Sequence, residues 1–203
     1  MVLNKVLKRS FYERDTRIVA LELIGKILVF RNGNKEFRGE IVETEAYLGA
    51  TDPASHAFRG PTPRNQVMFG PPGVSYVYFT YGFHHCLNVV TEKDGTAGAV
   101  LIRALEPISD MEEIKKRRSG IRNMADFTNG PGKLTQAFGM TREHSGIDLT
   151  GKNKLCLEEG GEAQFKRIGV SPRIGIREAK DILFRFFDED SSFISRKSLS
   201  RGI

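Results

Sequence analysis

Two glutamates two residues apart in an apolar segment are the residues best placed to do chemistry. The segment 41–47, Ile-Val-Glu-Thr-Glu-Ala-Tyr, is typical of a strand, whose period-two geometry puts Glu43, Glu45 and Tyr47 on one face. A carboxylate at a strand end beside a cleft can activate water as a general base. The alternative is a solvated sheet face without a chemical role. A glycosidase-type pair is disfavoured, because two carboxylates on one strand point in parallel.

Four of the five tyrosines occur close to this segment in the sequence, together with a histidine. They are Tyr47, Tyr76, Tyr78 and Tyr81, with His56 among them. Aromatic rings can stack on a base that has left the duplex. Because ring faces attract cations, such a pocket would favour alkylated purines, which carry a positive charge. The alternative is that these tyrosines are half-buried strand residues, which suits Tyr76, and that His56 is an ordinary loop histidine.

A large aromatic residue stands at the tip of a predicted hairpin. The strands of this hairpin are 74–80 and 83–90, and Tyr81-Gly82 lies between them. A hairpin tip favours Asn, Asp or Gly, so Tyr81, followed by Phe83, is unusual there. Apolar wedges of this kind can enter a base step and hold a duplex open. We therefore predict a protruding, DNA-intercalating hairpin in which Tyr81 is the wedge and Phe83 lies beside it.

One arginine interrupts an otherwise apolar strand. Arg103 lies within the predicted strand 99–105, and a buried arginine requires a paired charge or an anionic ligand. We expect it to meet a carboxylate or a phosphate. Residues His84 and His85 point to opposite faces of their strand and have no suitably spaced partner, so we predict no metal site. No organic cofactor is expected either.

Length and composition restrict the class of protein. With 203 residues, 39% of them hydrophobic, the chain can form one core, so we predict a single domain over 1–203. A net charge of +6 favours a polyanionic partner, a weak signal on its own. Cys86 and Cys156 lack metal-type spacing, which fits a reducing compartment. With no apolar run of about 18 residues and no evident export signal, we expect a cytoplasmic protein without membrane contact.

Local sequence signals predict an α+β fold with a largely antiparallel, curved sheet and flanking helices. A helix capped by Asp15 or Thr16 ends at Gly25, and Asn32-Gly33 signals a hairpin. Ser109 and Glu112 form a capping box at the start of a second helix, and 132–138 is a shorter one. The long segment 49–73 has no periodicity and is predicted to be a functional loop. The expected strands are 26–31, 35–46, 74–80, 83–90, 99–105, 154–157, 165–170 and 182–187.

Several of these segments together resemble the alkyladenine (3-methyladenine) DNA glycosylase family. The matching segments are 41–49, 62–65, 76–78, Tyr81-Gly82, Asn88, 101–107, 130–134 and 167–170. The resemblance extends over nearly the whole chain and implies a monofunctional glycosylase with a mixed α/β fold. Such an enzyme flips damaged purines (3-methyladenine, 7-methylguanine, hypoxanthine, ethenoadenine) from duplex DNA and hydrolyses the N-glycosidic bond, which starts base excision repair. No strand cleavage is expected.

The resemblance also implies a role for individual residues. Glu45 would be the general base and Arg103 would position the water or a nearby phosphate, with the backbone carbonyl near Ile168 also holding the water. The base-pocket residues would be Tyr47 and His56 on one face of the base, Tyr78 on the other, and Asn88 on the floor, where it excludes guanine. Tyr81 would fill the gap in the duplex. The expected partner is double-stranded DNA with a damaged purine, bound by a monomer.

Two other functions remain open from the sequence. A binding module could use the same basic surface and hairpin to recognise distorted DNA, and would tolerate Glu45→Gln. A hydrolase of small glycosides or nucleosides would leave Tyr81 without a purpose. Comparable activity on free nucleosides and duplex DNA, unaffected by Tyr81→Ala, would favour that second alternative.

Overall fold

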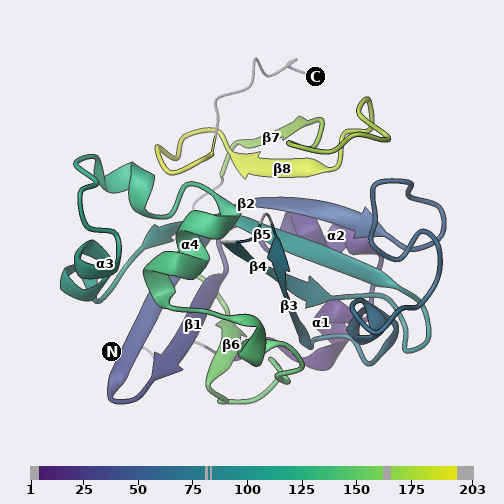
Figure 1. Cartoon of the computed structure of the whole chain (residues 1–203), viewed down its shortest axis with the longest axis horizontal. Helices are drawn as coiled ribbons and strands as arrows, with labels where there is room; N and C mark the ends of the chain where they lie inside the picture. Colours follow the sequence, from purple (N-terminus) through teal and green to yellow (C-terminus); the bar gives the residue numbers. More distant parts are fainter. Residues whose placement is uncertain (1–4, 81, 83, 162–165, 196–203) are drawn as a thin grey trace.

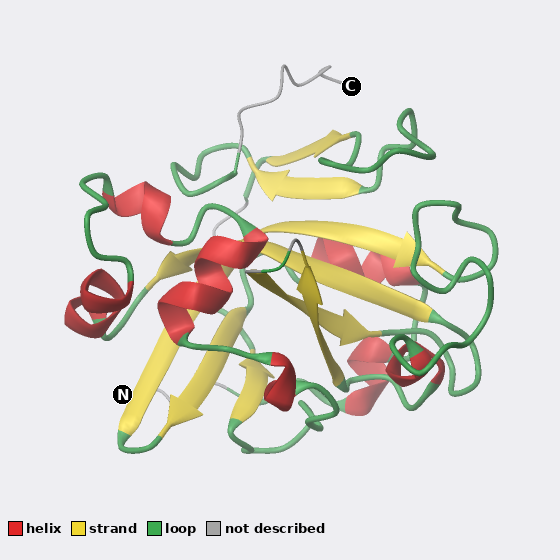
Figure 2. Cartoon of the chain, in the orientation of Figure 1, coloured by secondary structure: helices red, strands yellow, loops and turns green. Residues whose placement is uncertain are grey.

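A computed structural model describes residues 5–80, 82, 84–161 and 166–195. Within these residues, eight strands form one sheet with helices on its flanks (Figure 2). The strands are β1 Ile27–Asn32, β2 Lys35–Leu48, β3 Ser75–Thr80, β4 His84–Val90, β5 Gly98–Pro107, β6 Leu155–Glu158, β7 Ile168–Ser171 and β8 Arg185–Asp188. The α-helices are α1 Arg9–Tyr12, α2 Thr16–Glu22, α3 Met111–Arg117 and α4 Pro131–Phe138, and the 3-10 helices are η1 Gln66–Phe69, η2 Met124–Phe127 and η3 Arg142–His144.

The sheet is antiparallel along its main path, in the order β3-β4-β5-β2-β1-β6. β8 pairs with β2 and with β7, so these two short strands lie beside the end of β2 that leads to the long loop (Figure 1). The prediction of an α+β fold on a curved, largely antiparallel sheet is confirmed. β2 is the central element, because it pairs with β1, β5 and β8.

The two long hairpin strands follow from local sequence. In the β1–β2 hairpin, Asn32 pairs with Lys35, so the turn residues are Gly33 and Asn34, one position later than the predicted Asn32-Gly33. Gly33 has a φ of 59°, which glycine adopts without the steric cost that a Cβ would add. The turn fixes the register that brings Glu43 and Glu45 to their place in the sheet.

An irregularity in β2 lies at the acidic segment. The register with β5 shifts on both sides of Glu43, so that Ile41 pairs with Leu105, Glu43 with Ala104 and Thr44 with Ile102. Bulges of this kind redirect side chains and often occur next to active sites. Within this irregular stretch, Val42 packs in a different apolar cluster from Ala46.

Helix α2 packs against the face of β2 that carries Thr44. Asp15 is its N-cap and accepts a hydrogen bond from the Arg17 amide, as predicted. The hydroxyl of Thr44 donates to the Ala20 carbonyl at 2.8 Å. Thr44 therefore faces the helix, and its neighbours Glu43 and Glu45 face away from it, as strand alternation requires.

The capping box predicted for α3 is wrong. Its N-cap is Asp110, which has a left-handed φ of 57° and makes no side-chain capping bond. The Ser109 hydroxyl instead accepts a hydrogen bond from the Arg38 amide and donates to the Glu36 carbonyl. The Ser109 hydroxyl therefore bonds to the backbone of β2 and does not cap the helix.

The second hairpin is formed by β3 and β4, paired from Ser75–Val89 to Thr80–His84. Gly82 in its turn has a φ of 76°. Tyr81 and Phe83, the predicted intercalating residues, lie outside the described residues. The prediction of a DNA wedge therefore remains a prediction.

Candidate active site

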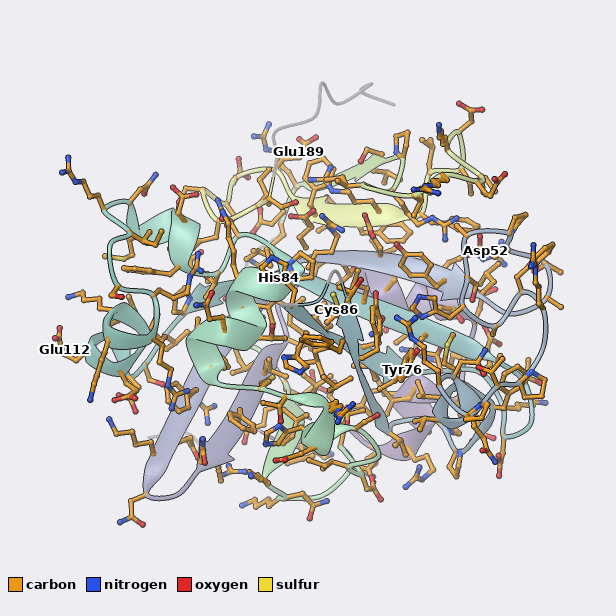
Figure 3. The ribbon with its side chains drawn as sticks, in the orientation of Figure 1. Asp52, Tyr76, His84, Cys86, Glu112 and Glu189 are labelled. Carbon is orange, nitrogen blue, oxygen red and sulfur yellow. The ribbon has the colours of Figure 1, made fainter. Side chains whose placement is uncertain are left out.

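A cavity of about 470 Å³ opens on one face of the sheet, where alternate residues of β3, β4 and β5 and Tyr47 of β2 line it. Its walls come from these strands, from the loop after β2 and from the segment between β7 and β8. Figure 3 shows Tyr76 and Cys86 from adjacent strands, with Asp52 on the loop beyond them. The residues that line it include Tyr47, Pro53, Ala54, His56, Tyr76, Tyr78, Cys86, Asn88, Leu101, Arg103 and Ile174–Glu178.

Glu45 lies directly behind this lining and is completely buried. Its Oε2 accepts hydrogen bonds from the Tyr47 hydroxyl at 2.8 Å and from Arg103 Nη1 at 3.2 Å. Its Oε1 accepts one from the Ile174 amide at 2.7 Å. All three donors belong to residues that line the cavity. Since a carboxylate oxygen can accept two hydrogen bonds, Oε1 keeps a position for a further donor such as water.

Glu43 and Arg103 extend this site into a buried charge network. Arg103 Nε donates to Glu43 Oε1 at 3.0 Å, and Arg185 Nε donates to the same oxygen at 2.6 Å. The amide and hydroxyl of Ser195 also donate to Glu43, at 2.6 and 2.7 Å. The prediction that Arg103 meets a carboxylate is confirmed. The solvated sheet face considered for the two acids is wrong, because both are buried.

The two carboxylates have opposite electrostatic surroundings. Burial raises the pKa of Glu45, and the charge of Arg103 with the hydrogen bonds from Ile174 and Tyr47 offsets only part of this effect. Burial also acts on Glu43, but the charges of Arg103 and Arg185 outweigh it and hold the pKa of that carboxyl below its usual value. Glu45 is therefore the more basic of the two, and Glu43 serves as the permanent counter-ion of the arginines.

An aromatic cluster from β3 and the loop after β2 forms part of the cavity wall. The ring centroids of His56 and Tyr78 are 4.6 Å apart in an edge-to-face contact, and those of Tyr76 and Tyr78 are 5.4 Å apart. His56 Nδ1 lies 3.1 Å from the Tyr76 hydroxyl. Burial, with the nearby charge of Arg64, lowers the pKa of His56, which favours a neutral imidazole at neutral pH.

Tyr47 and Asn88 complete the polar features of the cavity. Burial and the charge of Glu45 raise the pKa of Tyr47 well above its usual value, so its hydroxyl stays protonated and donates to Glu45. Asn88 is buried, and its side-chain nitrogen donates to the Tyr76 carbonyl at 3.0 Å. This bond leaves the amide oxygen of Asn88 as the group available to a ligand.

The structure brings together most of the residues singled out from the sequence. Glu45, Arg103, Tyr47, His56, Tyr78 and Asn88 all line the cavity or contact its wall. Ile168 is not among the described residues that line the cavity; it lies in β7, where it pairs with Asp188 of β8. The backbone of Ile174 reaches Glu45 instead, which no sequence signal indicated.

No group of three or more His, Cys, Asp or Glu residues in the described ranges could hold a metal ion. No helix in the described part of the chain is long and apolar enough to cross a membrane.

Comparison with known proteins decides the family. The sequence model of the family described as methylpurine-DNA glycosylase (MPG) matches residues 10–192. The chain belongs to the methylpurine-DNA glycosylase family. It is thus a glycosylase, a hydrolase of N-glycosyl bonds. The cavity, with its buried carboxylate and aromatic wall, is accordingly the candidate active site of a methylpurine-DNA glycosylase.

Bacterial members of this methylpurine-DNA glycosylase family are similar along their whole length. A protein of Chlorobium phaeobacteroides is 45% identical over 197 residues, covering 97% of this chain and 98% of its own. A protein of Carboxydothermus hydrogenoformans is 47% identical and covers 95% of this chain and 100% of its own length. A protein of Chlorobaculum tepidum is 48% identical and covers 95% of this chain and 91% of its own length. All three carry the name 3-methyladenine DNA glycosylase.

Proposed function

We propose that the chain is a monofunctional DNA glycosylase that flips damaged purines from duplex DNA and hydrolyses their N-glycosidic bond with Glu45 as the general base. The observation that carries this proposal is the placement of Glu45. Glu45 is a buried carboxylate that accepts hydrogen bonds from Arg103 and from the Ile174 amide, both of which belong to residues that line the aromatic cavity. Its raised pKa makes it a stronger base than an exposed glutamate.

In the proposed reaction, a water bound at Oε1 of Glu45 attacks the anomeric carbon of the deoxyribose. A carbon–oxygen bond forms, the N-glycosidic bond breaks with its electron pair leaving on the purine nitrogen, and the water proton passes to Glu45. The transition state has oxocarbenium character, which the negative charge of Glu45 stabilises. Arg103 holds the carboxylate in place through Nη1 and is itself held by Glu43.

The aromatic wall suggests where the flipped base stacks. A base held between two rings requires about 7 Å between them, two contacts of about 3.5 Å each, so it does not fit between His56 and Tyr78, whose centroids are 4.6 Å apart. We propose that the base stacks between Tyr47 on one side and the His56–Tyr78 pair on the other. This arrangement revises the sequence-based expectation that His56 shares a side with Tyr47.

The remaining roles are also proposals. Tyr81, with Phe83, would enter the duplex at the tip of the β3–β4 hairpin, and Asn88 would exclude guanine at the pocket floor. We propose that the chain acts as a monomer on double-stranded DNA. No lysine lines the cavity in the described residues, so no Schiff base and no strand cleavage are expected.

A panel of duplexes, each with one modified purine, tests the proposed function. Cationic 3-methyladenine and 7-methylguanine should be released faster than neutral hypoxanthine and ethenoadenine, because a cationic purine leaves without further protonation. The released bases are identified by chromatography, and the abasic strands are examined for cleavage. Release from none of these duplexes, or cleaved strands without added base, would contradict the proposal.

The pH dependence of release provides a separate prediction. Only ionised Glu45 can accept a proton, so activity should fall as pH decreases through its pKa, and this fall should begin above the ordinary glutamate value because burial raises the pKa. The single-turnover rate is measured on 7-methylguanine from about pH 4 to about pH 8. This lesion is already cationic, so protonation of the base does not obscure the profile. A rate that stays constant down to about pH 4.3, the usual glutamate pKa, would contradict the prediction.

A further inference from the structure

Arg173 is a buried cation next to the active site, in the segment between β7 and β8. Its side chain has no exposed surface, and its ion-pair partner Asp52 is 1% exposed. Nη1 and Nη2 donate to the two oxygens of Asp52 at 2.5 and 2.8 Å, and Nη1 also donates to the Ala46 carbonyl at 2.9 Å. Such a two-pronged contact requires the planar fork of arginine.

These bonds tie together three segments that are distant in sequence. Ala46 belongs to β2 and Asp52 to the long loop that follows it. Asp52 also organises that loop, because its carboxylate accepts hydrogen bonds from the amides of Leu48 and Ala54, each at 3.1 Å. Ala54 lines the cavity. Arg173 thus fixes the segment that follows β7 against both the acidic strand and the cavity loop.

Arg173 also covers one face of Tyr47. Its guanidinium carbon lies 4.7 Å from the centroid of the Tyr47 ring and 5.4 Å from that of Phe184. Tyr47 lines the cavity and donates its hydroxyl hydrogen bond to Glu45. Because Arg173 occupies one side of the ring, it restricts the ring orientation and leaves the other face for a base.

The residue after Arg173 supplies the hydrogen bond to the other carboxylate oxygen of Glu45, the one that Tyr47 and Arg103 do not contact. The amide of Ile174 donates to Glu45 Oε1 at 2.7 Å. An amide is placed by its own backbone, and here that backbone is anchored by the adjacent Arg173 side chain. Arg173 itself is absent from the described residues that line the cavity, so it acts only through its neighbours.

We propose that Arg173 is a positioning residue of the glycosylase reaction, which holds the Ile174 amide against Glu45 and the ring of Tyr47 against the cavity. This inference rests on the proposed role of Glu45 as the base. We call the contacts of Arg173 with Asp52 and Ala46 the clamp. Loss of the clamp displaces the Ile174 amide and the Tyr47 ring, while the Glu45 carboxylate itself remains. A displacement of about 1 Å at a reaction centre can reduce a rate about 100-fold.

The test is the Arg173→Lys variant, which keeps the charge beside Asp52 but cannot make all the contacts of the guanidinium. We expect the single-turnover release of 7-methylguanine to fall about 10- to 100-fold, with the duplex Kd within about twofold. The acid limb of the pH profile should move to higher pH, because the Ile174 hydrogen bond no longer favours ionised Glu45. Arg103 and Glu43, the charged groups that face Glu45, are not altered by this substitution. The Tyr47 hydroxyl also favours ionised Glu45 through its hydrogen bond, so displacement of its ring changes the pKa of Glu45 in the same direction.

The matched control is Arg38→Lys, which alters an arginine paired with Glu158 outside the cavity. It should release the base at the wild-type rate. Rates are compared below the melting transition of each variant. Asp52→Asn weakens the same clamp from the loop side and should reproduce both the lower rate and the pH displacement. In the wild-type protein, the NMR shift of the Ile174 amide proton should follow the titration of Glu45.

The outcomes separate this inference from the proposed function. If Glu45→Gln releases the base at the wild-type rate, the proposed role of Glu45 is wrong. A second outcome is that Glu45→Gln is inactive, while Arg173→Lys and Asp52→Asn both fold and keep the wild-type rate and the wild-type acid limb of the pH profile. In that case only the role of Arg173 is wrong. An Ile174 amide shift that is independent of the Glu45 titration would overturn it as well, even if neither variant folds.

Discussion

Replacing Glu45 with glutamine should reduce base release by about 10²- to 10⁴-fold, the usual contribution of a general base. Glutamine has the shape of glutamate and can still accept the Ile174 hydrogen bond at its amide oxygen, but it cannot take a proton from water. Single-turnover release of 7-methylguanine gives the rate, and a gel-shift titration of the same duplex gives its Kd, which should remain close to that of the wild type.

This comparison also separates an enzyme from a binding module. Glu106→Gln is the matched control, since it makes the same chemical change on the adjacent strand β5 at an exposed position outside the cavity lining. It should behave as the wild type. Release by Glu45→Gln at the wild-type rate would show that Glu45 is not the base.

Replacing Arg103 with methionine should destabilise the fold by about 3–5 kcal/mol, the usual loss when one partner of a buried ion pair is removed. The Arg103 side chain is 8% exposed, and those of Glu43 and Glu45 are 0% exposed. Methionine fills much of the volume but leaves Glu45 without a cationic partner, whereas Glu43 keeps Arg185. Urea unfolding at neutral pH measures the difference.

The pH dependence of this deficit identifies its cause. Without Arg103, the pKa of Glu45 in the folded state rises further above that in the unfolded chain, so the folded state binds more protons and its relative stability increases as pH falls. The deficit should therefore shrink toward about pH 5. Arg167→Met, at the exposed ion pair with Asp190, should cost about 0–1 kcal/mol. A pH-independent deficit, or one no larger than that of the control, would contradict the ion-pair explanation.

The strands and turns could be predicted because their signals are local. Alternation of apolar residues and the Asn-Gly dipeptide indicate hairpins within a few residues of the chain, and the structure has β1–β2 and β3–β4 close to the predicted bounds. Arg103 was also identifiable, since an arginine inside an apolar strand requires a partner. The same signal was present at Arg185, in the run Phe184-Arg185-Phe186-Phe187, and would have indicated the second arginine of the network.

The features that could not be predicted depend on contacts between distant segments. The bulge at Glu43 arises from the pairing of β2 with β5, and Ser109 is bound by Arg38, 71 positions earlier. The clamp of Arg173 on Asp52 joins residues 121 positions apart. The Ile174 amide is still harder to foresee, because a backbone hydrogen bond does not depend on residue type. The bulge, the Arg173 clamp and the Ile174 amide determine the surroundings of Glu45, so the sequence indicated the proposed catalytic carboxylate better than the contacts that hold it.

A stopped-flow experiment with a duplex that contains fluorescent ethenoadenine tests the central claim most directly, because it follows base flipping and base release in one trace. For the wild type we predict a fast fluorescence change as the base enters the aromatic cavity, followed by a slow phase that matches chemical release. Glu45→Gln should keep the fast phase and lose the slow one. A slow phase at the wild-type rate in Glu45→Gln, or no fast phase in either protein, would contradict the account.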